Sequence, residues 1–417
     1  MKTPVRYWSR RSVPSITFYS LANRASNLCS KIFDPTFTPK ARTTQLKRCP
    51  SAPRLHASAL RLPLSAIPRI IPLAISWSPF ARRRMPEPRL LVVRLGSLGD
   101  IVHTFPAVSG LRETFPNAEI VWLTHPRWKP LVESSTLASQ VWTTETRSPT
   151  SLRKTIDDLR SAHWNAAIDY QGLWKSAALP FFAGIRPRIG FSQETVRELG
   201  VPLLYTDKVR CSAIHIADQN GELSLRAGAH NPAAPFKLRV PQVDDCGIRD
   251  YLQKLGLDRY VVLSPGGGWR SKCWPPERFG QLSQLIRDSL GLRCVVNYGP
   301  GEEDLALAVR ECSGDADPVP YNGPLGPLMA LLSNASCIVG GDTGPLHLAI
   351  ALGAPAVALF GPTDPARNGP YRTDDIVLRA PNVVTTYSRS DQTHSSILQI
   401  QVPEVFVAVR SRLGVPA

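Results

Sequence analysis

From residue 89 onward, short apolar runs alternate with amphipathic stretches, and this alternation occurs twice along the chain. Short apolar runs that end at glycine or polar turn residues are typical of buried strands, and apolar residues spaced three or four apart are typical of helices. Strands that alternate with helices form parallel sheets covered on both faces. The pattern therefore predicts an α/β protein with two doubly wound parallel-sheet domains in tandem.

Each round of the alternation predicts its own set of strands and helices. In the first round we expect strands over 90–95, 119–123, 140–143 and 165–170, and helices over 100–114 and 151–162. In the second round we expect strands over 260–264, 293–298, 337–340 and 355–360, and helices over 276–290, 302–312, 327–335 and 345–352.

The alternation weakens between about 195 and 250, where a proline-rich stretch (231–235) and an acidic pair indicate a linker region. We therefore expect an N-terminal domain over 89–240 and a C-terminal domain over 250–417. In doubly wound sheets, ligands bind at the carboxyl ends of the strands. Two such domains in tandem predict a ligand cleft between them.

The positive charge of the chain lies almost entirely before residue 85. The formal net charge is +16, but residues 1–84 contain 16 lysines and arginines and one acid, Asp34. The rest of the chain contains 33 basic and 32 acidic residues. Because the body is nearly neutral, the main support for a nucleic-acid-binding protein disappears, and we expect no nucleic-acid partner.

Residues 1–84 are rich in proline and serine and show no sustained helical or strand period, so we expect a disordered basic leader. Its most apolar part, 62–80, contains four prolines, which argues against a transmembrane helix. No uninterrupted apolar region follows the basic start, so a signal peptide is a poor fit. Two explanations remain open: an organelle transit peptide, or a protein that starts at Met85 with upstream sequence translated before it.

Five residues, G-S-L-G-D over 96–100, join the first predicted strand to the first helix. Asp100 would lie at the start of the helix, on the cleft side of the sheet. One interpretation is an N-cap, for which aspartate is favoured. The other is a general base that removes a proton from an acceptor hydroxyl. Asp100 can serve as both only if a substrate reaches its free oxygen.

A second strand-to-helix turn contains Asp342, Thr343, Gly344 and His347. Proline just inside a helix is favoured, and Pro345 follows the turn. A helix N-terminus with free amides can bind a diphosphate, although an ordinary capped turn is the alternative. His347 would face the same side as the helix start, and a single histidine there is more often structural than catalytic.

The loop after the predicted strand 260–264 contains three glycines, 266–268, followed by Arg270 and Lys272. Such a loop can cradle phosphate oxygens, although a solvated loop is the alternative. Glu303 follows another strand and could accept hydrogen bonds from a ribose, or it could be a solvated carboxylate at a helix start. The convergence of these features at strand ends favours a nucleotide-diphosphate site.

The eight cysteines form no C-x-x-C pair and have no nearby histidines at zinc spacing. We expect neither a disulfide framework nor a metal site, as in a protein of a reducing cytosol. The cysteines are Cys29, Cys49, Cys211, Cys246, Cys273, Cys294, Cys312 and Cys337.

Four segments together resemble the ADP-heptose:lipopolysaccharide heptosyltransferases of glycosyltransferase family 9, and most of all the heptosyltransferase I group. The segments are R-L-G-S-L-G-D-I-V-H-T-F-P-A (94–107), I-D-Y-Q-G-L-W-K-S-A-A-L (168–179), S-K-C-W-P-P-E-R-F (271–279) and the stretch 341–363 that begins G-D-T-G-P-L-H. The resemblance covers nearly all of 89–417, and the Q-G-L-W-K-S-A and R-I-G-F (188–191) segments favour heptosyltransferase I.

The resemblance implies the GT-B arrangement, with the acceptor on the first domain and the ADP-sugar on the second. It implies that Asp100 is the catalytic base and that Gly99, Lys175 and Arg127 bind the acceptor. The donor residues it implies are Ser271, Lys272, Glu303, Asp342, Thr343, Gly344 and His347. Glu302 is adjacent to Glu303, so the ribose contact is uncertain by one residue. Lys129, Arg186, Arg188 and Arg197 are further candidates for an anionic acceptor.

The activity that the resemblance implies is inverting transfer of L-glycero-D-manno-heptose from ADP-heptose to the Kdo of Kdo2-lipid A. It implies a monomer without cofactor or metal, peripheral on the cytoplasmic face of the inner membrane. Heptosyltransferase II, or a relative with another nucleotide-sugar or acceptor, is the alternative. A non-catalytic nucleotide-sugar binding protein is a further alternative, against which the presence of both Asp100 and Lys272 argues.

Overall fold

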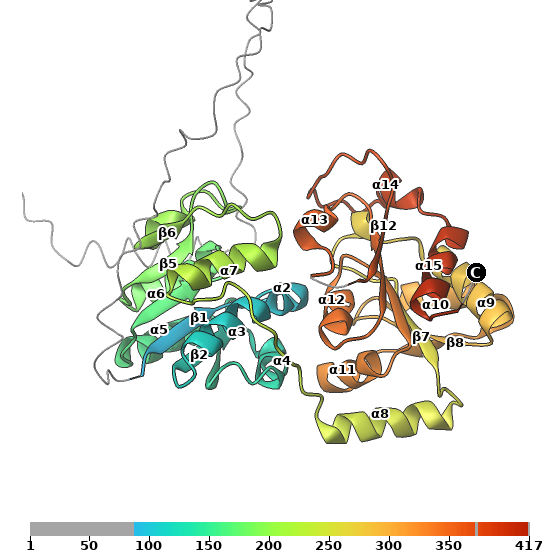
Figure 1. Cartoon of the computed structure of the whole chain (residues 1–417), viewed down its shortest axis with the longest axis horizontal. Helices are drawn as coiled ribbons and strands as arrows, with labels where there is room; N and C mark the ends of the chain where they lie inside the picture. Colours follow the sequence, from blue (N-terminus) through green and yellow to red (C-terminus); the bar gives the residue numbers. More distant parts are fainter. Residues whose placement is uncertain (1–86, 372–373, 416–417) are drawn as a thin grey trace, which may run out of the picture. The chain divides into compact units, whose positions relative to one another are not determined.

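The computed structural model describes residues 87–371 and 374–415 of the chain (Figure 1). The leader 1–84, for which the sequence predicts disorder, lies outside the described residues. Residues Pro86–Ala417 form a single unit by their contacts, so the elements within it can be placed against one another.

Two six-stranded sheets form the centre of this unit, and every strand pairing in them is parallel. The N-terminal sheet has the order β3-β2-β1-β4-β5-β6. Its strands are β1 (Arg89–Val93), β2 (Glu119–Thr124), β3 (Gln140–Thr143), β4 (Ala166–Asp169), β5 (Arg188–Phe191) and β6 (Asp207–Val209).

The C-terminal sheet has the order β12-β11-β10-β7-β8-β9. Its strands are β7 (Tyr260–Ser264), β8 (Arg293–Asn297), β9 (Val319–Tyr321), β10 (Cys337–Gly341), β11 (Ala356–Phe360) and β12 (Ile376–Arg379). Both sheets have the Rossmann strand order, with a switch point between β1 and β4 and between β7 and β10. The predicted fold class of two doubly wound parallel sheets is confirmed.

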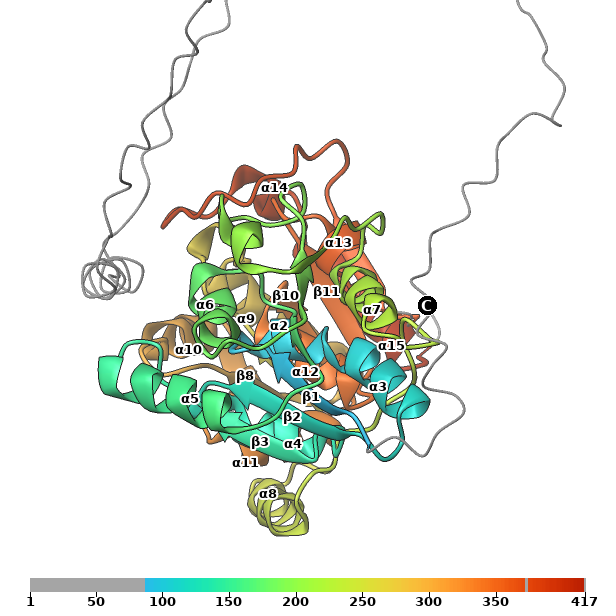
Figure 2. The same cartoon turned by 90° about the vertical axis from the view of Figure 1, so that its left-hand side faces the viewer.

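Helices cover both faces of each sheet. In the N-terminal half they are α2 (Leu98–Val102), α3 (Phe105–Thr114), α4 (Lys129–Ser134), α5 (Pro149–Ser161), α6 (Trp174–Phe182) and α7 (Ile216–Arg226). Helix α3 packs on α7, and α5 packs on α6 at the other side of the sheet (Figure 2). Short 3-10 turns occur at Pro126–Trp128, Val201–Leu204, Arg270–Lys272 and Gly314–Ala316.

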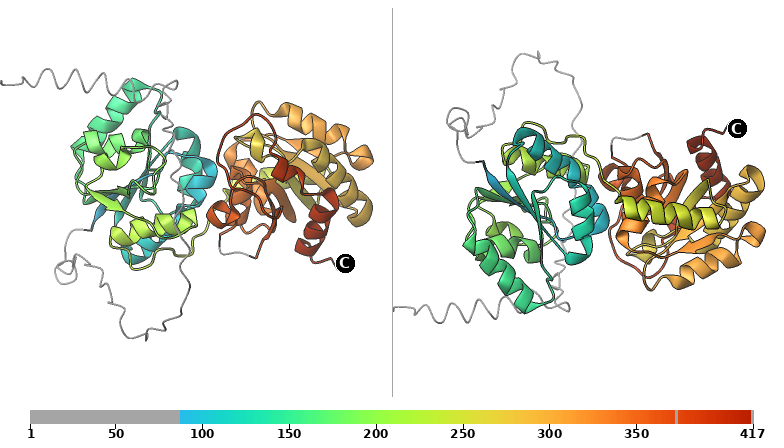
Figure 3. Two further views of the ribbon diagram at one scale, coloured as in Figure 1. Left: turned by 90° about the horizontal axis from the view of Figure 1, so that it is seen from above. Right: turned by 90° about the horizontal axis from the view of Figure 1, so that it is seen from below.

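The helices that follow are α8 (Gln242–Lys254), α9 (Pro276–Leu290), α10 (Glu303–Glu311), α11 (Leu325–Ser333), α12 (Gly344–Ala351), α13 (Pro365–Asn368), α14 (Ser395–Leu398) and α15 (Val402–Arg412). Helix α8 precedes β7 in the chain and packs against α11, so it belongs to the C-terminal half (Figure 3).

The strands of the C-terminal sheet divide their side chains between two cores, because successive residues of a strand point to opposite faces. In β7, Val261 and Leu263 join the core beneath α9 and α15. Tyr260 and Val262 join the core beneath α8, α11 and α12. Burial on both faces explains why the sequence of β7 reads as a continuous apolar run rather than an alternating one.

The structure contains strands β5, β6, β9 and β12 and helices α4, α6 and α15 that the sequence analysis did not predict, and it differs from the prediction at two further helical regions. The helix expected over 100–114 is divided into α2 and α3 at His103 and Thr104. Pro106 has no N–H with which to continue α2, and it is tolerated in the first turn of the new helix. The linker expected between 195 and 250 contains β6, α7 and the start of α8, and its longest stretch without helix or strand is 227–241. Asp244 and Asp245 stand in the first turn of α8, where acidic residues stabilise a helix.

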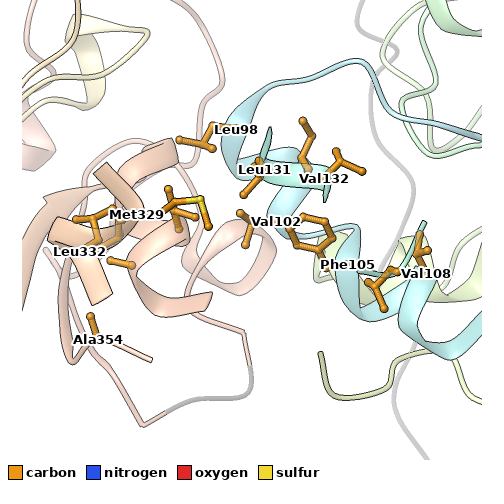
Figure 4. Close-up of a cluster of buried hydrophobic side chains, with 14 of the residues drawn as sticks. Leu98, Val102, Phe105, Val108, Leu131, Val132, Met329, Leu332 and Ala354 are labelled. Atoms are coloured by element: carbon orange, nitrogen blue, oxygen red, sulfur yellow. The ribbon is translucent and has the colours of Figure 1, made fainter. Parts of the chain in front are cut away.

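One apolar core continues from the N-terminal half into the C-terminal half. Leu98 and Val102 of α2 and Leu131 of α4 lie opposite Met329 of α11 (Figure 4). All four side chains are at least nine-tenths buried. At about 1.5–3 kcal/mol for each fully buried large apolar side chain, this contact stabilises the arrangement of the two halves.

Two glycines allow α2 and α12 to approach each other at their N-terminal ends. A Cβ on Gly344 of α12 would lie 2.8 Å from the Cβ of Leu98, and a Cβ on Gly99 of α2 would lie 2.9 Å from Cδ2 of His347. Real Cβ atoms do not approach other carbons this closely, so both positions require glycine. The starts of the two helices, one from each sheet, therefore meet.

We expect Gly344→Ala to lower the free energy of unfolding by about 1–3 kcal/mol, because the added methyl group forces α2 and α12 apart. Urea denaturation measures the change. Gly247→Ala is the matched control, since a Cβ there meets no atom within 4 Å in helix α8, and helix propensity predicts a gain of about 0.5–1 kcal/mol. A Gly344→Ala variant as stable as the wild type would contradict the close approach of the two helices.

Candidate active site

A cleft of about 1040 Å³ lies between the two sheets, at the carboxyl ends of their strands. Its walls come mainly from the turns that follow β1, β7, β8, β9 and β10. This is the position at which doubly wound sheets bind ligands. The residues on which the following paragraphs depend are Asp100, Lys272, Glu302, Asp342, Thr343 and His347.

Asp100 lines the cleft from the first turn of α2, and the N-cap of this helix is Ser97 rather than Asp100. Its Oδ2 accepts hydrogen bonds from the backbone N–H of Ser97 at 3.1 Å and from the Ser97 hydroxyl at 2.8 Å. Its Oδ1 lies 2.7 Å from a terminal nitrogen of Arg94. The side chain is still 45% exposed and lines the cleft. A substrate hydroxyl can therefore reach the carboxylate while the cap holds it in place.

The charge state of Asp100 is set largely by Arg94, which is buried at the end of β1. Burial on its own raises the pKa of Asp100, but the charge of Arg94 and the hydrogen bonds from Ser97 outweigh it and lower the pKa below its usual value. Arg94 is fixed in turn, because it donates a hydrogen bond to the backbone carbonyl of Tyr170. Asp100 is therefore an ionised carboxylate, able to accept a proton, at neutral pH.

A second charged group lies at the start of α12. Asp342 is buried, its Oδ1 lies 3.1 Å from Nε2 of His347, and its Oδ2 lies 3.7 Å from Nζ of Lys272. Lys272 also donates a hydrogen bond to the backbone carbonyl of Asp342. Burial by itself raises the pKa of Asp342, but the hydrogen bond from His347 and the charge of Lys272 hold it well below the usual value. The ionised Asp342 thus orients both the lysine and the histidine.

His347 is also in contact with the N-terminal half. Its ring lies edge-on to the ring of His103, with 4.4 Å between centroids, and His215 lies 5.4 Å from His103. Burial, together with the neighbouring rings of His347 and His215, holds the pKa of His103 well below its usual value. His103 is therefore uncharged at neutral pH and adds no positive charge beside Asp100.

Thr343 and the first turn of α12 provide anion-binding groups. Thr343 is the N-cap of α12, and its Oγ1 is buried with no hydrogen-bond partner among the described residues. An unpaired buried hydroxyl is costly unless a ligand satisfies it. The helix N-terminus that begins here also favours negative charge. This end of the cleft has the chemistry of a phosphate site.

Glu302 joins two loops of the C-terminal half. Its carboxylate accepts hydrogen bonds from the backbone N–H of Gly267 at 3.1 Å and of Gly299 at 2.8 Å. Gly266 allows the carboxylate to pack directly against the loop, since a Cβ there would collide with it. Glu302 therefore holds the glycine loop after β7 in position at the wall of the cleft.

The structure brings most of the site residues predicted from the sequence into one cleft. Those that line it are Gly99, Asp100, Arg127, Lys272, Asp342, Thr343, Gly344 and His347. Arg127 stacks on Trp128, with 4.8 Å from its guanidinium carbon to the ring centroid. Their roles in binding or catalysis stay predictions.

Three predicted residues lie elsewhere. Glu303 is exposed at the start of α10, and its neighbour Glu302 is the one that lines the cleft, so Glu302 becomes the candidate for the predicted ribose contact. Ser271 is buried beneath the segment 390–394, where its backbone bonds Ser390 and His394. Lys175 is not among the cleft residues and lies on α6. Among the further candidates, Arg188 is buried and donates to two backbone carbonyls of its own half.

Several cleft residues carry no signal in the sequence analysis. They are Trp128, Trp269, Asn297, Tyr387 and Arg389, whereas Arg197, a further candidate from the sequence, also lines the cleft. Most lie in loops distant from the glycine turns, and a loop residue becomes part of a site only through tertiary packing. Asn297 ends a strand, and its position was a usable signal.

Within residues 87–371 and 374–415, no group of three or more histidine, cysteine, aspartate or glutamate side chains is arranged to hold a metal ion. The same residues include no helix that is both long and apolar enough to cross a membrane. The D-x-D sequence at Asp315 and Asp317 lies outside the cleft, where Asp317 pairs with Arg293 at 3.2 Å.

Comparison with known proteins shows which family this chain belongs to. The profile of glycosyltransferase family 9 (heptosyltransferase) matches residues 152–396. The chain belongs to this family. It is 30% identical over 306 residues to lipopolysaccharide heptosyltransferase 1 of Escherichia coli K12, covering 70% of this chain and 94% of that protein.

Solved structures of family members have the same fold. E. coli heptosyltransferase WaaC with ADP-2-deoxy-2-fluoro heptose matches with a TM-score of 0.61 and 25% identity, over 78% of this chain and 99% of WaaC. E. coli ADP-heptose lps heptosyltransferase II matches with a TM-score of 0.66 and 20% identity, over 78% of this chain and 98% of the other. Our chain thus has the GT-B arrangement, like these family members.

The charge of Arg94 should set the acid limb of the pH–activity profile. An aspartate with a lowered pKa stays ionised until the pH falls below that pKa. The pKa of Asp100 lies under the usual value of about 3.9, so Asp100 remains able to accept a proton until the pH falls below that lowered pKa. In Arg94→Gln the stabilising charge is lost, so the pKa of Asp100 rises and the acid limb of kcat/KM moves to higher pH. Transfer assays over the acid range, with folding checked by circular dichroism, measure the shift.

Arg89→Gln is the control for this measurement. It removes an arginine from the opposite end of the same strand, where Arg89 pairs with Glu119 at 3.0 Å. We expect the acid limb of the pH–activity profile of Arg89→Gln to stay at the wild-type position. An unshifted limb in Arg94→Gln, or an equal shift in Arg89→Gln, would show that Arg94 does not control the ionisation of Asp100.

Substitutions of Glu302 and of its neighbour Glu303 test whether Glu302 holds the glycine loop, residues 266–268, in position. In Glu302→Gln only one amide oxygen remains to accept from two backbone N–H groups, so the loop loosens. We expect the KM for the nucleotide-sugar to rise about tenfold, which corresponds to about 1.4 kcal/mol. Glu303→Gln, one residue away and exposed, should leave that KM unchanged. Equal effects of the two substitutions would count against Glu302 as the residue that holds the glycine loop.

Proposed function

We propose that this chain is an inverting heptosyltransferase that moves L-glycero-D-manno-heptose from ADP-heptose to the Kdo of Kdo2-lipid A, the reaction of heptosyltransferase I. The observation that carries the proposal is that an ionised Asp100 and an anion-binding helix start, from different sheets, line one cleft. Membership of the family and the identity to heptosyltransferase 1 proteins support the donor and the acceptor.

The donor diphosphate is assigned to the start of α12. Lys272 supplies a positive charge there, and Thr343 supplies an unpaired hydroxyl and lies next to free amides. Asp342 holds Lys272 in place through its backbone carbonyl and its carboxylate. These groups would bind ADP more tightly as charge develops on its leaving oxygen, which lowers the barrier for departure.

The acceptor reaction is assigned to Asp100. Its carboxylate accepts the proton of the acceptor hydroxyl, whose oxygen forms a bond to the anomeric carbon of heptose. The bond from that carbon to the phosphate oxygen breaks on the opposite side, and the electron pair leaves with ADP. The proton remains on Asp100 until solvent removes it. Attack and departure on opposite faces invert the configuration of the sugar.

We further propose that the enzyme works at the cytoplasmic surface of the inner membrane, because its acceptor is a membrane glycolipid. Two leucines support a surface contact. Leu199 and Leu203 are 82% and 75% exposed, and they follow Arg197, which lines the cleft. Exposed apolar side chains beside basic ones suit the boundary of an anionic membrane.

The acceptor decides between the heptosyltransferase I reaction and that of heptosyltransferase II. The full chain is incubated with ADP-heptose and either Kdo2-lipid A or the same lipid that already carries one heptose. We expect ADP release and a mass gain of one heptose with the first lipid only. Transfer to the second lipid alone would assign the heptosyltransferase II reaction, and transfer to neither would overturn the proposed function.

Lys272→Ala tests the phosphate assignment in the same assay. We expect the KM for ADP-heptose to rise at least tenfold, because a buried charge contact with phosphate is lost. Lys254→Ala, at the exposed end of α8, is the control with an unchanged KM. A donor KM unaffected by Lys272→Ala would remove Lys272 from the donor site.

A further inference from the structure

Three arginines gather around two aromatic rings at one end of the cleft. They line a pocket of about 450 Å³ formed by Arg197, Trp269, Arg367, Tyr387 and Arg389. The guanidinium carbons of Arg197 and Arg367 lie 5.9 Å and 5.6 Å from the ring centroid of Tyr387. That of Arg389 lies 5.0 Å from the ring centroid of Trp269. These five residues are called the arginine cluster below.

The arginine cluster has no acid in direct contact with it, although the charges of Asp100 and Asp342 act on Arg367 from farther away. None of its three arginines forms an ion pair with any described residue, and the hydrogen bond of Arg367 goes to the neutral side chain of Asn368 at 2.9 Å. Burial, followed by the charge of Arg197, lowers the pKa of Arg367. Like charges brought together without a counter-charge repel one another, and a bound anion removes this repulsion.

The arginine cluster adjoins both the catalytic base and the donor site. Arg197 and Arg367 also line a small pocket that contains Asp100 and Arg94. Arg197, Tyr387 and Arg389 also line the large cleft that contains Lys272. An anion held by the cluster would therefore lie beside the hydroxyl that Asp100 deprotonates, rather than at the distant lipid part of an acceptor.

We infer that the arginine cluster binds a carboxylate of the acceptor, on the sugar acid that bears the reacting hydroxyl. This inference rests on the proposed function. Arginine guanidinium groups match carboxylates through paired N–H donors, and the aromatic rings limit the positions of the guanidinium planes. Arg197 belongs to the N-terminal half, whereas Arg367 and Arg389 belong to the C-terminal half. The half that holds the donor thus also contacts the acceptor, and one carboxylate links both halves when the site is filled.

The test removes the two C-terminal charges and separates acceptor from donor affinity. In the double variant Arg367→Gln/Arg389→Gln of the full chain, we expect the KM for Kdo2-lipid A to rise at least tenfold and the KM for ADP-heptose to stay within twofold of wild type. Arg259→Gln/Arg287→Gln is the matched control, because it removes two exposed arginines of the same half outside the cleft. We expect both KM values of the control to match the wild type.

Chemically altered acceptors identify the anion. With the carboxylates of the acceptor converted to methyl esters, we expect the wild type to lose acceptor affinity and the double variant to lose little more, since the interaction is already absent. With the lipid phosphates removed instead, we expect the tenfold difference between wild type and double variant to persist. If dephosphorylation rather than esterification removes that difference, the cluster binds phosphate and the carboxylate assignment is wrong.

The outcomes separate this inference from the proposed function. Wild-type turnover combined with an unchanged acceptor KM in the double variant would overturn the arginine cluster as an acceptor site and leave the proposed function intact. No turnover by the wild-type chain would overturn the proposed function, and the acceptor assignment with it.

Discussion

The close contact between the starts of α2 and α12 is the constraint on which the site depends. Gly344 against Leu98 and Gly99 against His347 leave no room for a Cβ, and this brings together two turns from different sheets. Each turn follows a strand next to a switch point of its own sheet. The apolar packing of Leu98 and its neighbours against α11 supports the contact. Asp100 and the start of α12, to which the donor phosphates are assigned, therefore share one cleft without either being held by a long loop.

The two carboxylates of the cleft are kept ionised by different partners and serve different purposes. Asp100 is paired with Arg94 and remains accessible to a substrate. Asp342 is buried and bonded to His347 and Lys272, so it positions other groups rather than meeting the acceptor. The arginine cluster adds positive charge without an acid partner. In the proposed mechanism, the base, the donor phosphates and the acceptor anion would each be served by different charged side chains.

Much of the fold and part of the site could be predicted from the sequence, because both depend on local patterns. Continuous apolar runs revealed the central strands, and the glycine turns at 96–100 and 341–344 marked the strand ends where ligands bind. The helix boundary at Pro106 and the helix α7 were missed, since they depend on packing against α3 and its neighbours. The residues Arg367, Tyr387 and Arg389 were missed for the same reason. Nothing in their local sequence indicates that folding brings them beside Asp100.

The most direct test of this account is a single-turnover experiment on Asp100→Asn, which keeps the shape of the side chain and removes its ability to accept a proton. We predict that ADP-heptose binds with an unchanged dissociation constant, because the donor site is assigned to the other sheet. We also predict that transfer to Kdo2-lipid A falls by at least a hundredfold, since the loss of a general base typically lowers the rate by about 100- to 10,000-fold. Transfer at the wild-type rate would contradict the role of Asp100. A parallel loss of donor binding would contradict the separation of base and donor site.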